Sequence, residues 1–349
     1  MYLAWNEIRR NKLKFGLIIG ILVMVSYLLF FLSGLANGLI NMNREGIDKW
    51  HADAIILNKD ANKTVAQSVI DKKEVDGNFK KEAYLTQTGV IVSNGKEKEN
   101  ALLFGVASKS FLMPKLISGH AFKENNEVVA DKTLKEKGFK LGDKLTLSQS
   151  DESLTIVGFS ESAKYNASPV LFSNAQTMEK INPMFNEDKT NAVVIKDENW
   201  KEQDLSNNLE AVAISDFVES LPGYQAQNTT LNFMIVFLFI ISAAVIGIFL
   251  YVITLQKTSL FGVLKAQGFT NGYLARVVLA QTFIIALIGT VIGLVLTLIT
   301  GAFIPAAVPV AFNALTLILF GIGLILVSIV GSLFSILTVR KVDPLKAIG

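Results

Sequence analysis

Long apolar runs alternate with charged segments along the chain. Residues 15–39, 231–255 and 277–339 contain no Asp, Glu, Lys, Arg or His. A membrane-spanning helix needs about 20 apolar residues, so the first two runs can each cross a bilayer once and the third can cross it twice. The sequence therefore predicts an α-helical membrane protein with four transmembrane helices.

The third run divides at residues 303–313. Pro305 and Pro309 interrupt helical hydrogen bonding there, and Asn313 is a suitable cap for a following helix. We therefore expect transmembrane helices over 277–302 and 314–339, joined by an outer loop over 303–313.

The segment between the first two spans, residues 40–230, has a different pattern. Short alternating or β-branched runs are separated by Gly, Asn and Lys clusters, which is typical of strands. Residues 131–143 favour a short helix that Asp131 caps and Gly138 stops. An α+β domain is therefore inserted between helices 1 and 2, with strands expected at 52–57, 88–93, 127–130, 144–148 and 154–159.

Composition supports the membrane class. Hydrophobic residues make up 51% of the 349 positions and the mean hydropathy is +0.42, while the absence of cysteine excludes disulfides and thiolate metal sites. The basic start of the chain resembles a secretory signal. However, its apolar run of 25 residues exceeds the usual 7 to 15 and no A-x-A site follows, so we expect an uncleaved anchor.

Lysine and arginine are concentrated near three ends of the predicted spans. Residues 1–14, 256–276 and 340–349 carry ten of them, with only Glu7 and Asp343 as acids. Positive segments are retained in the cytoplasm. We therefore expect both termini and the 256–276 loop to be cytoplasmic, and residues 40–230 to be extracytoplasmic.

The cytoplasmic loop contains the stretch LFGVLKAQGF at 260–269. Residues 260–267 predict a short helix that ends at Gly268, followed by a turn at Asn271-Gly272. Its apolar face would lie at the bilayer interface and its small-residue face would admit a partner protein, although a plain interfacial turn is the alternative. The predicted apolar face holds Leu260, Phe261, Val263 and Leu264, and the docking face holds Gly262, Lys265 and Ala266.

The stretch LQKTSLFGVLKAQGFTNGYLARVVLAQ resembles the cytoplasmic loop of an ABC-transporter permease superfamily. That superfamily includes macrolide-exporter, lipoprotein-release and cell-division permeases, in which a K-x(3 to 4)-FG-[IV]-L-[KR]-A-x-G pattern forms a coupling helix. The inserted domain and the ending RKVDPLKAIG are also similar to the superfamily. Residues 217–269 resemble its haem-efflux branch in particular.

The resemblance implies a permease subunit that works with a separate ATPase. It implies two permease copies and two ATPase copies in the plasma membrane of a bacterium, with ATP and Mg²⁺ bound by the ATPase. The sequence itself contains no G-x-x-x-x-G-K-[ST] loop, no catalytic constellation and no feature that indicates a nucleic-acid partner. The residues expected to engage the ATPase are Phe261, Gly262, Val263, Leu264, Lys265, Ala266 and Gly268.

Haem would be the cargo and not a permanent cofactor, and its iron would be the only metal expected. An exporter of haem needs an apolar slot and possible axial or propionate partners. Met42 and Glu45 share a helical face with Lys49 if the first span continues outward. His120 is interpreted as an ordinary structural residue and not as a haem contact. The candidate contacts are Met42, Glu45, His51 and Tyr165, of which His51 and Tyr165 also suit ordinary structural positions.

Three pairs of glycines have the small-xxx-small spacing that brings membrane helices together. They are Gly16 with Gly20, Gly34 with Gly38, and Gly289 with Gly293. We favour Gly34 and Gly38 for a seam between two copies of the chain, because they lie at the outer end of the first span.

The resulting hypothesis is mechanical. ATP binding would move the ATPases, the coupling helix would transmit this motion, and a lipophilic cargo would be taken from the outer leaflet, since the spans carry no charge. Two alternatives remain open. One is an exporter of an antimicrobial peptide, glycolipid or lipoprotein, and the other is a signalling protein that regulates an extracellular partner.

Overall fold

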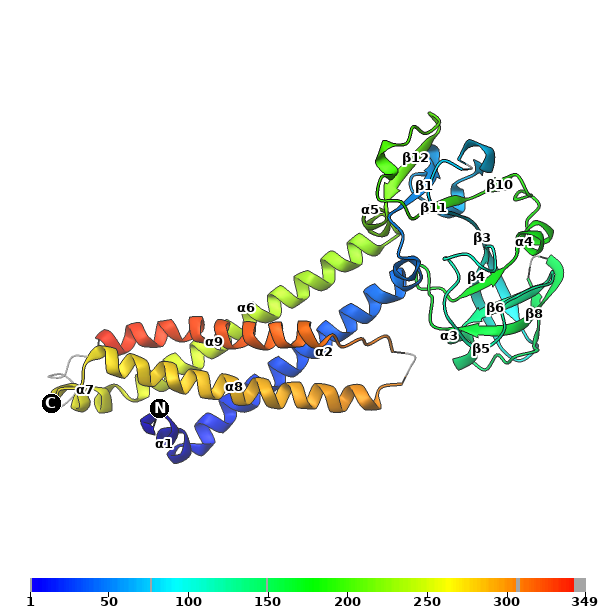
Figure 1. The fold of residues 1–349 in the computed structure, drawn as a ribbon. Coiled ribbons are helices and arrows are strands. Elements are labelled where there is room, and N and C mark those ends of the chain that lie inside the picture. Colours follow the sequence, from blue (N-terminus) through cyan, green and yellow to red (C-terminus); the bar gives the residue numbers. More distant parts are fainter. Residues whose placement is uncertain (1, 76, 149, 306–307, 342–349) are drawn as a thin grey trace. The chain divides into compact units, whose positions relative to one another are not determined.

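The computed structural model describes residues 2–75, 77–148, 150–305 and 308–341. The chain divides into two compact units. One unit, here called the helical unit, comprises residues 1–38 and 228–349. The other, here called the inserted domain, comprises Leu39–Gln227 (Figure 1).

Among the residues that the structure describes, four helices are long and apolar enough to cross a membrane. An α+β domain lies between the first and the second of them, so the predicted fold class is confirmed. The first, α2, continues without a break past Gly38, and its last turns belong to the inserted domain. The helices are α1 (Tyr2–Arg10), α2 (Lys12–Trp50), α6 (Tyr224–Gln256), α7 (Thr258–Ala266), α8 (Asn271–Phe303) and α9 (Ala314–Lys341).

Glycines allow close helix contacts within this unit. A Cβ added at Gly293 of α8 would lie 2.1 Å from the Ser26 hydroxyl of α2, and one added at Gly289 would lie 2.6 Å from Leu22. Ser26 Oγ donates to the Gly289 carbonyl at 3.1 Å. The predicted helix-pairing role of Gly289 and Gly293 is therefore confirmed, since only a residue without a side chain permits this approach.

A second close contact joins α6 to α9. A Cβ added at Gly331 would lie 2.6 Å from the carbonyl oxygen of Ala243. Ser335 donates to the Leu250 carbonyl at 3.0 Å and also hydrogen-bonds Thr254. Hydroxyl groups that bond helix carbonyls satisfy polar side chains inside an apolar environment, which suits membrane helices.

Gly34 and Gly38 contact the connection between α8 and α9 in the same chain. An added Cβ at Gly34 would lie 2.3 Å from the ring of Phe312, and one at Gly38 would lie 2.0 Å from the carbonyl oxygen of Pro309. The Ala311 N–H donates to the Gly34 carbonyl at 2.9 Å. Both glycines are thus needed for an intrachain contact, and a seam between two copies at this place stays a prediction.

The inserted domain is built on a continuous sheet with the strand order β12-β1-β11-β3-β4-β9-β6-β8-β5. Strand β7 pairs with β3 and β8, and a separate pair joins β10 to β2. The strands are β1 (Ala54–Asn58), β2 (Ile70–Asp71), β3 (Glu82–Ser93), β4 (Lys98–Gly105), β5 (Leu116–Gly119), β6 (Glu127–Asp131), β7 (Lys144–Leu147), β8 (Ser150–Ser160), β9 (Val170–Ser173), β10 (Lys189–Thr190), β11 (Ala192–Ile195) and β12 (Leu209–Ala213), with helices α3 (Lys132–Glu136), α4 (Ala175–Ile181) and α5 (Ile214–Glu219).

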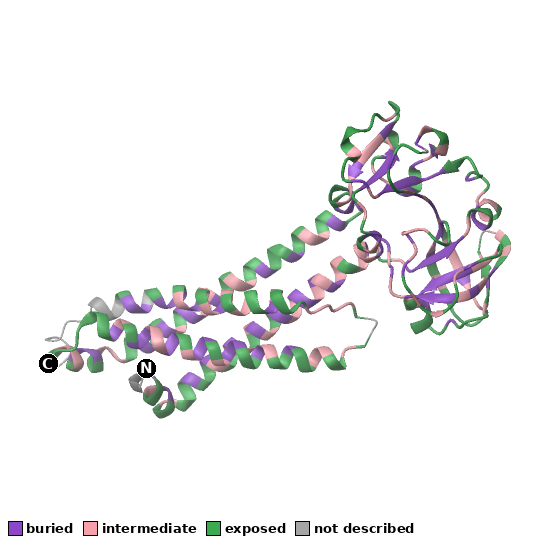
Figure 2. Ribbon diagram, viewed as in Figure 1, coloured by how far each residue is buried: buried purple, intermediate pink, exposed green. Residues whose placement is uncertain are grey.

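Strand β3 links the two halves of this sheet. Its first residues pair with β11, from Glu82 opposite Ile195 to Leu85 opposite Ala192, and its later residues pair with β4. Buried residues are frequent on these strands, whereas exposed residues are frequent on the long helices (Figure 2). This distribution is what a water-facing domain and membrane-facing helices require.

The local predictions for the inserted domain are confirmed. Each of the five predicted runs overlaps a strand, because alternating or β-branched residues pack well on a half-buried sheet. Asp131 caps α3 by accepting from the Thr133 N–H at 2.6 Å. Gly138 follows with a φ of 100°, a conformation that glycine adopts without strain.

Candidate functional site

Both the end of helix α7 and the start of the helix that follows it are well defined. Gly268 follows α7 with a φ of 91° and ends it as predicted. The Thr270 side chain accepts from the Tyr273 N–H at 3.2 Å and caps the next helix, α8. The predicted turn at Asn271-Gly272 is wrong, because both residues belong to the first turn of α8 and the chain reverses before them.

The faces of α7 differ from the predicted ones. Phe261 is 5% exposed and packs with Leu274 and Val278 of α8 and Ile336 of α9, and Leu264 packs against this cluster. Gly262 is buried as well, so it does not lie on an open docking face. Phe261 and Leu264 form one apolar stripe and Leu260 and Val263 form another beside it. The periodicity of the sequence does not determine which of the two stripes packs inward.

The open face of α7 is formed by Leu260, Val263 and Ala266. Leu260 is 49% exposed and Val263 is 40% exposed, and Ala266 is exposed beside them. These residues follow each other at intervals of three, so they form one stripe on the helix. Of the predicted docking residues, Val263 and Ala266 are therefore the best placed to touch a partner, and Lys265 is half-buried.

A polar cluster fastens helix α1 to the start of α7. Glu7 of α1 forms an ion pair with Lys257 and accepts a hydrogen bond from Gln281 of α8. Lys257 also lies 5.0 Å from the centre of the Phe15 ring. The ion pair is shielded, with 15% of the Lys257 side chain and 17% of the Glu7 side chain exposed. Charges in so apolar a setting interact more strongly than on an open surface.

The contacts of Glu7 with Lys257 and Gln281 are not evident from the sequence. The available signal was that Glu7 is one of only two acids in the strongly basic segments 1–14, 256–276 and 340–349. Its partner lies 250 positions away in the sequence, and no local pattern connects them.

The far end of α2 is joined to the loop that follows β8. The Gly46 N–H donates to the Lys164 carbonyl at 2.8 Å, and the Met42 and Asn43 carbonyls accept from the N–H groups of Ala167 and Asn166 at 3.0 and 2.9 Å. A Cβ at Gly46 would lie 2.8 Å from the Ala163 carbonyl oxygen. Backbone groups of the helix and of the loop therefore form one hydrogen-bonded unit.

Two of the predicted haem contacts lie at this junction. Glu45 accepts from the Ser162 hydroxyl at 2.6 Å and lies 3.7 Å from the Lys49 ammonium. Lys49 also donates to the Ser162 carbonyl and lies 3.7 Å from Glu161. Met42 is half-buried one helical turn before Glu45. The shared face predicted for Met42, Glu45 and Lys49 is present, and the Glu45 carboxylate has partners from its own chain.

The other two predicted contacts lie elsewhere. Tyr165 is 5% exposed and packs against Trp50 and Phe104, with ring centres 6.4 and 5.5 Å apart, and burial raises the pKa of its hydroxyl. These contacts give it a place in the core. His51 is exposed and follows α2 with a φ of 46°. Among the described residues, no group of three or more His, Asp or Glu is arranged to hold a metal ion.

Residues 232–344, which contain α7, α8, α9 and most of α6, match the family of FtsX-like permease C-terminal domains. This part of the chain is therefore similar to the permease domains of the FtsX type. The resemblance noted in the sequence is confirmed.

The relatives extend this similarity to the whole chain. The chain is 27% identical to the proposed hemin transport system permease protein HrtB of Staphylococcus epidermidis, over all of this chain and 99% of the relative. It is 26% identical to the corresponding protein of Staphylococcus haemolyticus, over the same shares. Among solved structures, it matches the periplasmic region of MacB from Actinobacillus actinomycetemcomitans with a TM-score of 0.35 and 15% identity, over 52% of this chain and 97% of that one.

Proposed function

We propose that this permease exports haem, with energy from a separate ABC ATPase, in an assembly of two permeases and two ATPases. The observation that carries the proposal is the similarity to the HrtB hemin permeases, which extends over the full length of both chains. ATP and Mg²⁺ would bind to the ATPase, and haem would be present only as cargo.

The exposed stripe of α7 supports the site assigned to the ATPase. Leu260 and Val263 are large apolar side chains at the surface, and Phe261 anchors the helix to α8 and α9 behind them. A short helix is marginally stable alone and gains rigidity from such an anchor. A push on this stripe would then move α7 together with the helices on which it packs.

Helix α2 supports the second part of the mechanism. It is helical from Lys12 to Trp50, and its last turns are bonded to the loop of residues 164–167 in the inserted domain. Motion of the permease helices would therefore reach the inserted domain through a continuous helix. We place the 256–276 loop and both termini in the cytoplasm of a bacterium, because those segments concentrate Lys and Arg.

Met42 and Glu45 are the residues we propose to contact the cargo. They lie at the end of the apolar part of α2 and are both half-buried. A thioether can ligate haem iron, whereas the Glu45 carboxylate would first have to leave Ser162 and Lys49, its present partners. Glu45 is therefore a group whose interactions would change when haem arrives.

The proposal is tested by expressing the chain with its ATPase and challenging the cells with hemin. We expect resistance to hemin that requires both subunits and an ATPase able to hydrolyse ATP. The purified pair should show a Soret band, and Met42→Leu should shift it. A chain that assembles with the ATPase but gives no resistance and no Soret band would reject haem as cargo. Resistance to a peptide antibiotic in the same cells would then favour the alternative exporter.

A further inference from the structure

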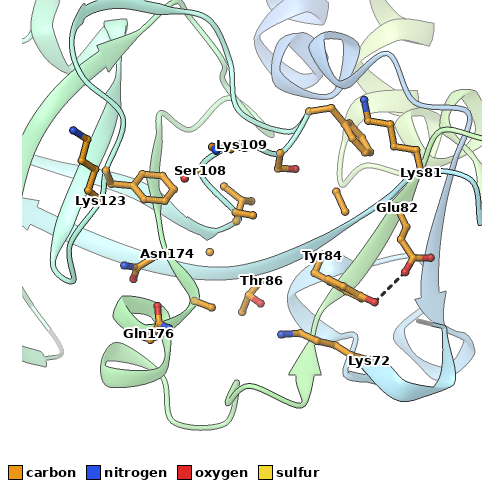
Figure 3. Close-up of a pocket in the computed structure, with 18 residues that line it drawn as sticks. Lys72, Lys81, Glu82, Tyr84, Thr86, Ser108, Lys109, Lys123, Asn174 and Gln176 are labelled. Atoms are coloured by element: carbon orange, nitrogen blue, oxygen red, sulfur yellow. Dashed lines mark hydrogen bonds between the residues drawn. The ribbon is translucent and has the colours of Figure 1, made fainter. Parts of the chain in front are cut away.

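The inserted domain contains a cavity of about 810 Å³ beside the first half of β3. Ligand sites for small molecules usually have volumes of about 300 to 1,000 Å³. The wall combines β3, the segment after β4, the segment before β6 and the start of α4 (Figure 3). These segments all belong to one compact unit, so the cavity is a feature of the inserted domain alone.

The wall of this cavity is strongly basic. Lys72, Lys81, Lys109 and Lys123 line it, and Glu82 is the only acidic residue in the lining. In Figure 3, Lys123 lies at one end of the cavity and Lys81 at the other. Among the described residues, no carboxylate lies within 4.0 Å of the ammonium of Lys81, Lys109 or Lys123. A wall with four cations and one acidic residue attracts an anion.

Two lysines share one aromatic ring at the edge of the cavity. The ammonium groups of Lys81 and Lys196 lie 5.4 and 4.6 Å from the centre of the Phe111 ring. Burial lowers the pKa of Lys196, the charge of Lys81 lowers it further, and Asp53 opposes both effects. An anion bound here would relieve the repulsion between the two ammonium groups.

Part of the rest of the lining is apolar. Val106 and Phe122 are nearly fully buried, and Phe111 is half-buried. Glu82 accepts through one oxygen from the Gly77 N–H at 3.0 Å and from the Tyr84 hydroxyl at 3.1 Å. The lining contains no His, Met or Cys. A ligand would therefore be held by its apolar body and its negative charges, without an axial bond to a metal.

We propose that this cavity binds an apolar molecule that carries carboxylates, and a porphyrin dicarboxylate in particular. The two carboxylates of a porphyrin leave the same edge of the ring, so they would pair with two of Lys81, Lys109 and Lys123 at one time, and the flat body would lie against Phe111. The choice of a porphyrin rests on the proposed function, whereas the cavity and its charge do not. The inserted domain would then hold cargo at a second place, away from the junction at Met42 and Glu45.

The test uses the full-length permease with its ATPase in nanodiscs and metal-free protoporphyrin IX as the probe. Replacing Lys81, Lys109 and Lys123 together with Gln should weaken binding about tenfold or more, because a single exposed ion pair contributes little and the triple variant removes every such pair at once. Glu82→Gln should leave binding equal or tighter, because it removes the one negative charge. The matched control replaces Lys98, Lys140 and Lys180 with Gln, three exposed lysines outside the cavity lining.

Two further ligands identify the chemistry. The dimethyl ester of protoporphyrin IX has the same body without the charges and should lose the lysine-dependent binding, and palmitate should compete only weakly. Equal binding by the triple variant and the unchanged protein would overturn the proposal, as would equal binding of the ester. Strong competition by palmitate would overturn the porphyrin assignment.

The cavity and the cargo proposals fail separately. Lysine-dependent porphyrin binding by a protein that gives cells no hemin resistance would reject haem export and keep the cavity. Hemin resistance together with porphyrin binding that does not depend on the lysines would reject the cavity and keep haem export.

Discussion

The N–H of Gly46 donates to the carbonyl of Lys164 at 2.8 Å. In a regular α-helix this N–H would donate to the carbonyl of Met42, four residues earlier. The Met42 carbonyl accepts from Ala167 at 3.0 Å. A loop of the inserted domain is therefore hydrogen-bonded to the backbone of α2, just beyond the long apolar run of that helix.

Gly46→Ala should break this junction. The added Cβ would meet two backbone carbonyl oxygens, those of Ala163 and Lys164, at 2.8 and 2.9 Å. Neither belongs to a flexible side chain, so the loop would have to move, which costs typically about 1–3 kcal/mol. We expect a lower melting temperature and loss of transport, with the ATPase still bound. Thermal unfolding and ATPase co-purification measure these effects.

The control for this prediction is Gly16→Ala in the same helix. No atom lies within 4 Å of a Cβ added there, so stability should change little. A Gly46→Ala protein that melts and transports like the unchanged protein would contradict the role of the junction.

The pair of Glu7 and Lys257 should couple α1 to α7. Replacing either residue with an uncharged one leaves the other shielded from water without its partner, at a cost of roughly 1–3 kcal/mol. We expect Lys257→Gln and Glu7→Gln each to lower ATP turnover in the assembled transporter. The double variant should be less impaired than the sum of the two singles, which a double-mutant cycle measures.

Lys14→Gln is the comparison for this pair. Lys14 is exposed and its ammonium donates to the Gln256 side chain at 2.7 Å, so its loss should matter less. Strict additivity of the Glu7 and Lys257 variants would show that the ion pair carries no coupling.

Val263→Glu should disrupt docking of the ATPase without unfolding the permease. Val263 is 40% exposed on the open stripe of α7, whereas Phe261 is buried beneath it. A charge in the apolar centre of an interface removes a contact and adds a desolvation cost. We expect at least a tenfold drop in co-purified ATPase.

Ile117→Glu provides the control, because Ile117 is 46% exposed in the inserted domain. It should leave the amount of ATPase unchanged. Normal ATPase binding by the Val263→Glu protein would show that the ATPase docks on a surface other than this stripe.

The Asp143 carboxylate should make the inserted domain sensitive to acid. It accepts from the Asn94 side chain and from the Lys140 N–H, both at 2.9 Å, and these bonds lower its pKa. Its stabilising effect is therefore present above the ordinary aspartate pKa of about 3.9 and is lost as the pH falls through the lowered value. Amide exchange over residues 137–147, corrected for the intrinsic rate, should accelerate only below about pH 4.

Asp143→Asn should remove most of this pH dependence and speed the exchange at neutral pH. Asp151→Asn, which changes an exposed residue, should do neither. Acid-dependent exchange that persists in Asp143→Asn would assign the effect to another group.

The sequence was most informative where a local pattern decides the structure. The strands at 54–58 and 150–160 follow from alternating or β-branched residues, and the cap at Asp131 follows from its place before a short helix. The four long helices follow from runs without charge. Each of these depends on neighbours within a few turns, which the sequence displays directly.

The contacts between distant segments could not be predicted in this way. The spacing of Gly34 and Gly38 indicates a close approach but does not name the partner, which is the Pro309–Phe312 segment of the same chain. Gly262 was expected on an open face and is buried, because the packing of α7 is decided by α8 and α9. Glu7 and Lys257 meet only in the folded chain.

The course of β3 has a consequence for recognition by the inserted domain. One strand of 12 residues pairs with β11 along its first part and with β4 along its second. The two halves of the sheet are therefore joined by one continuous strand and not by a flexible loop. A ligand that binds beside this strand therefore meets a preformed site, and little of its binding free energy is lost to a conformational change of the domain.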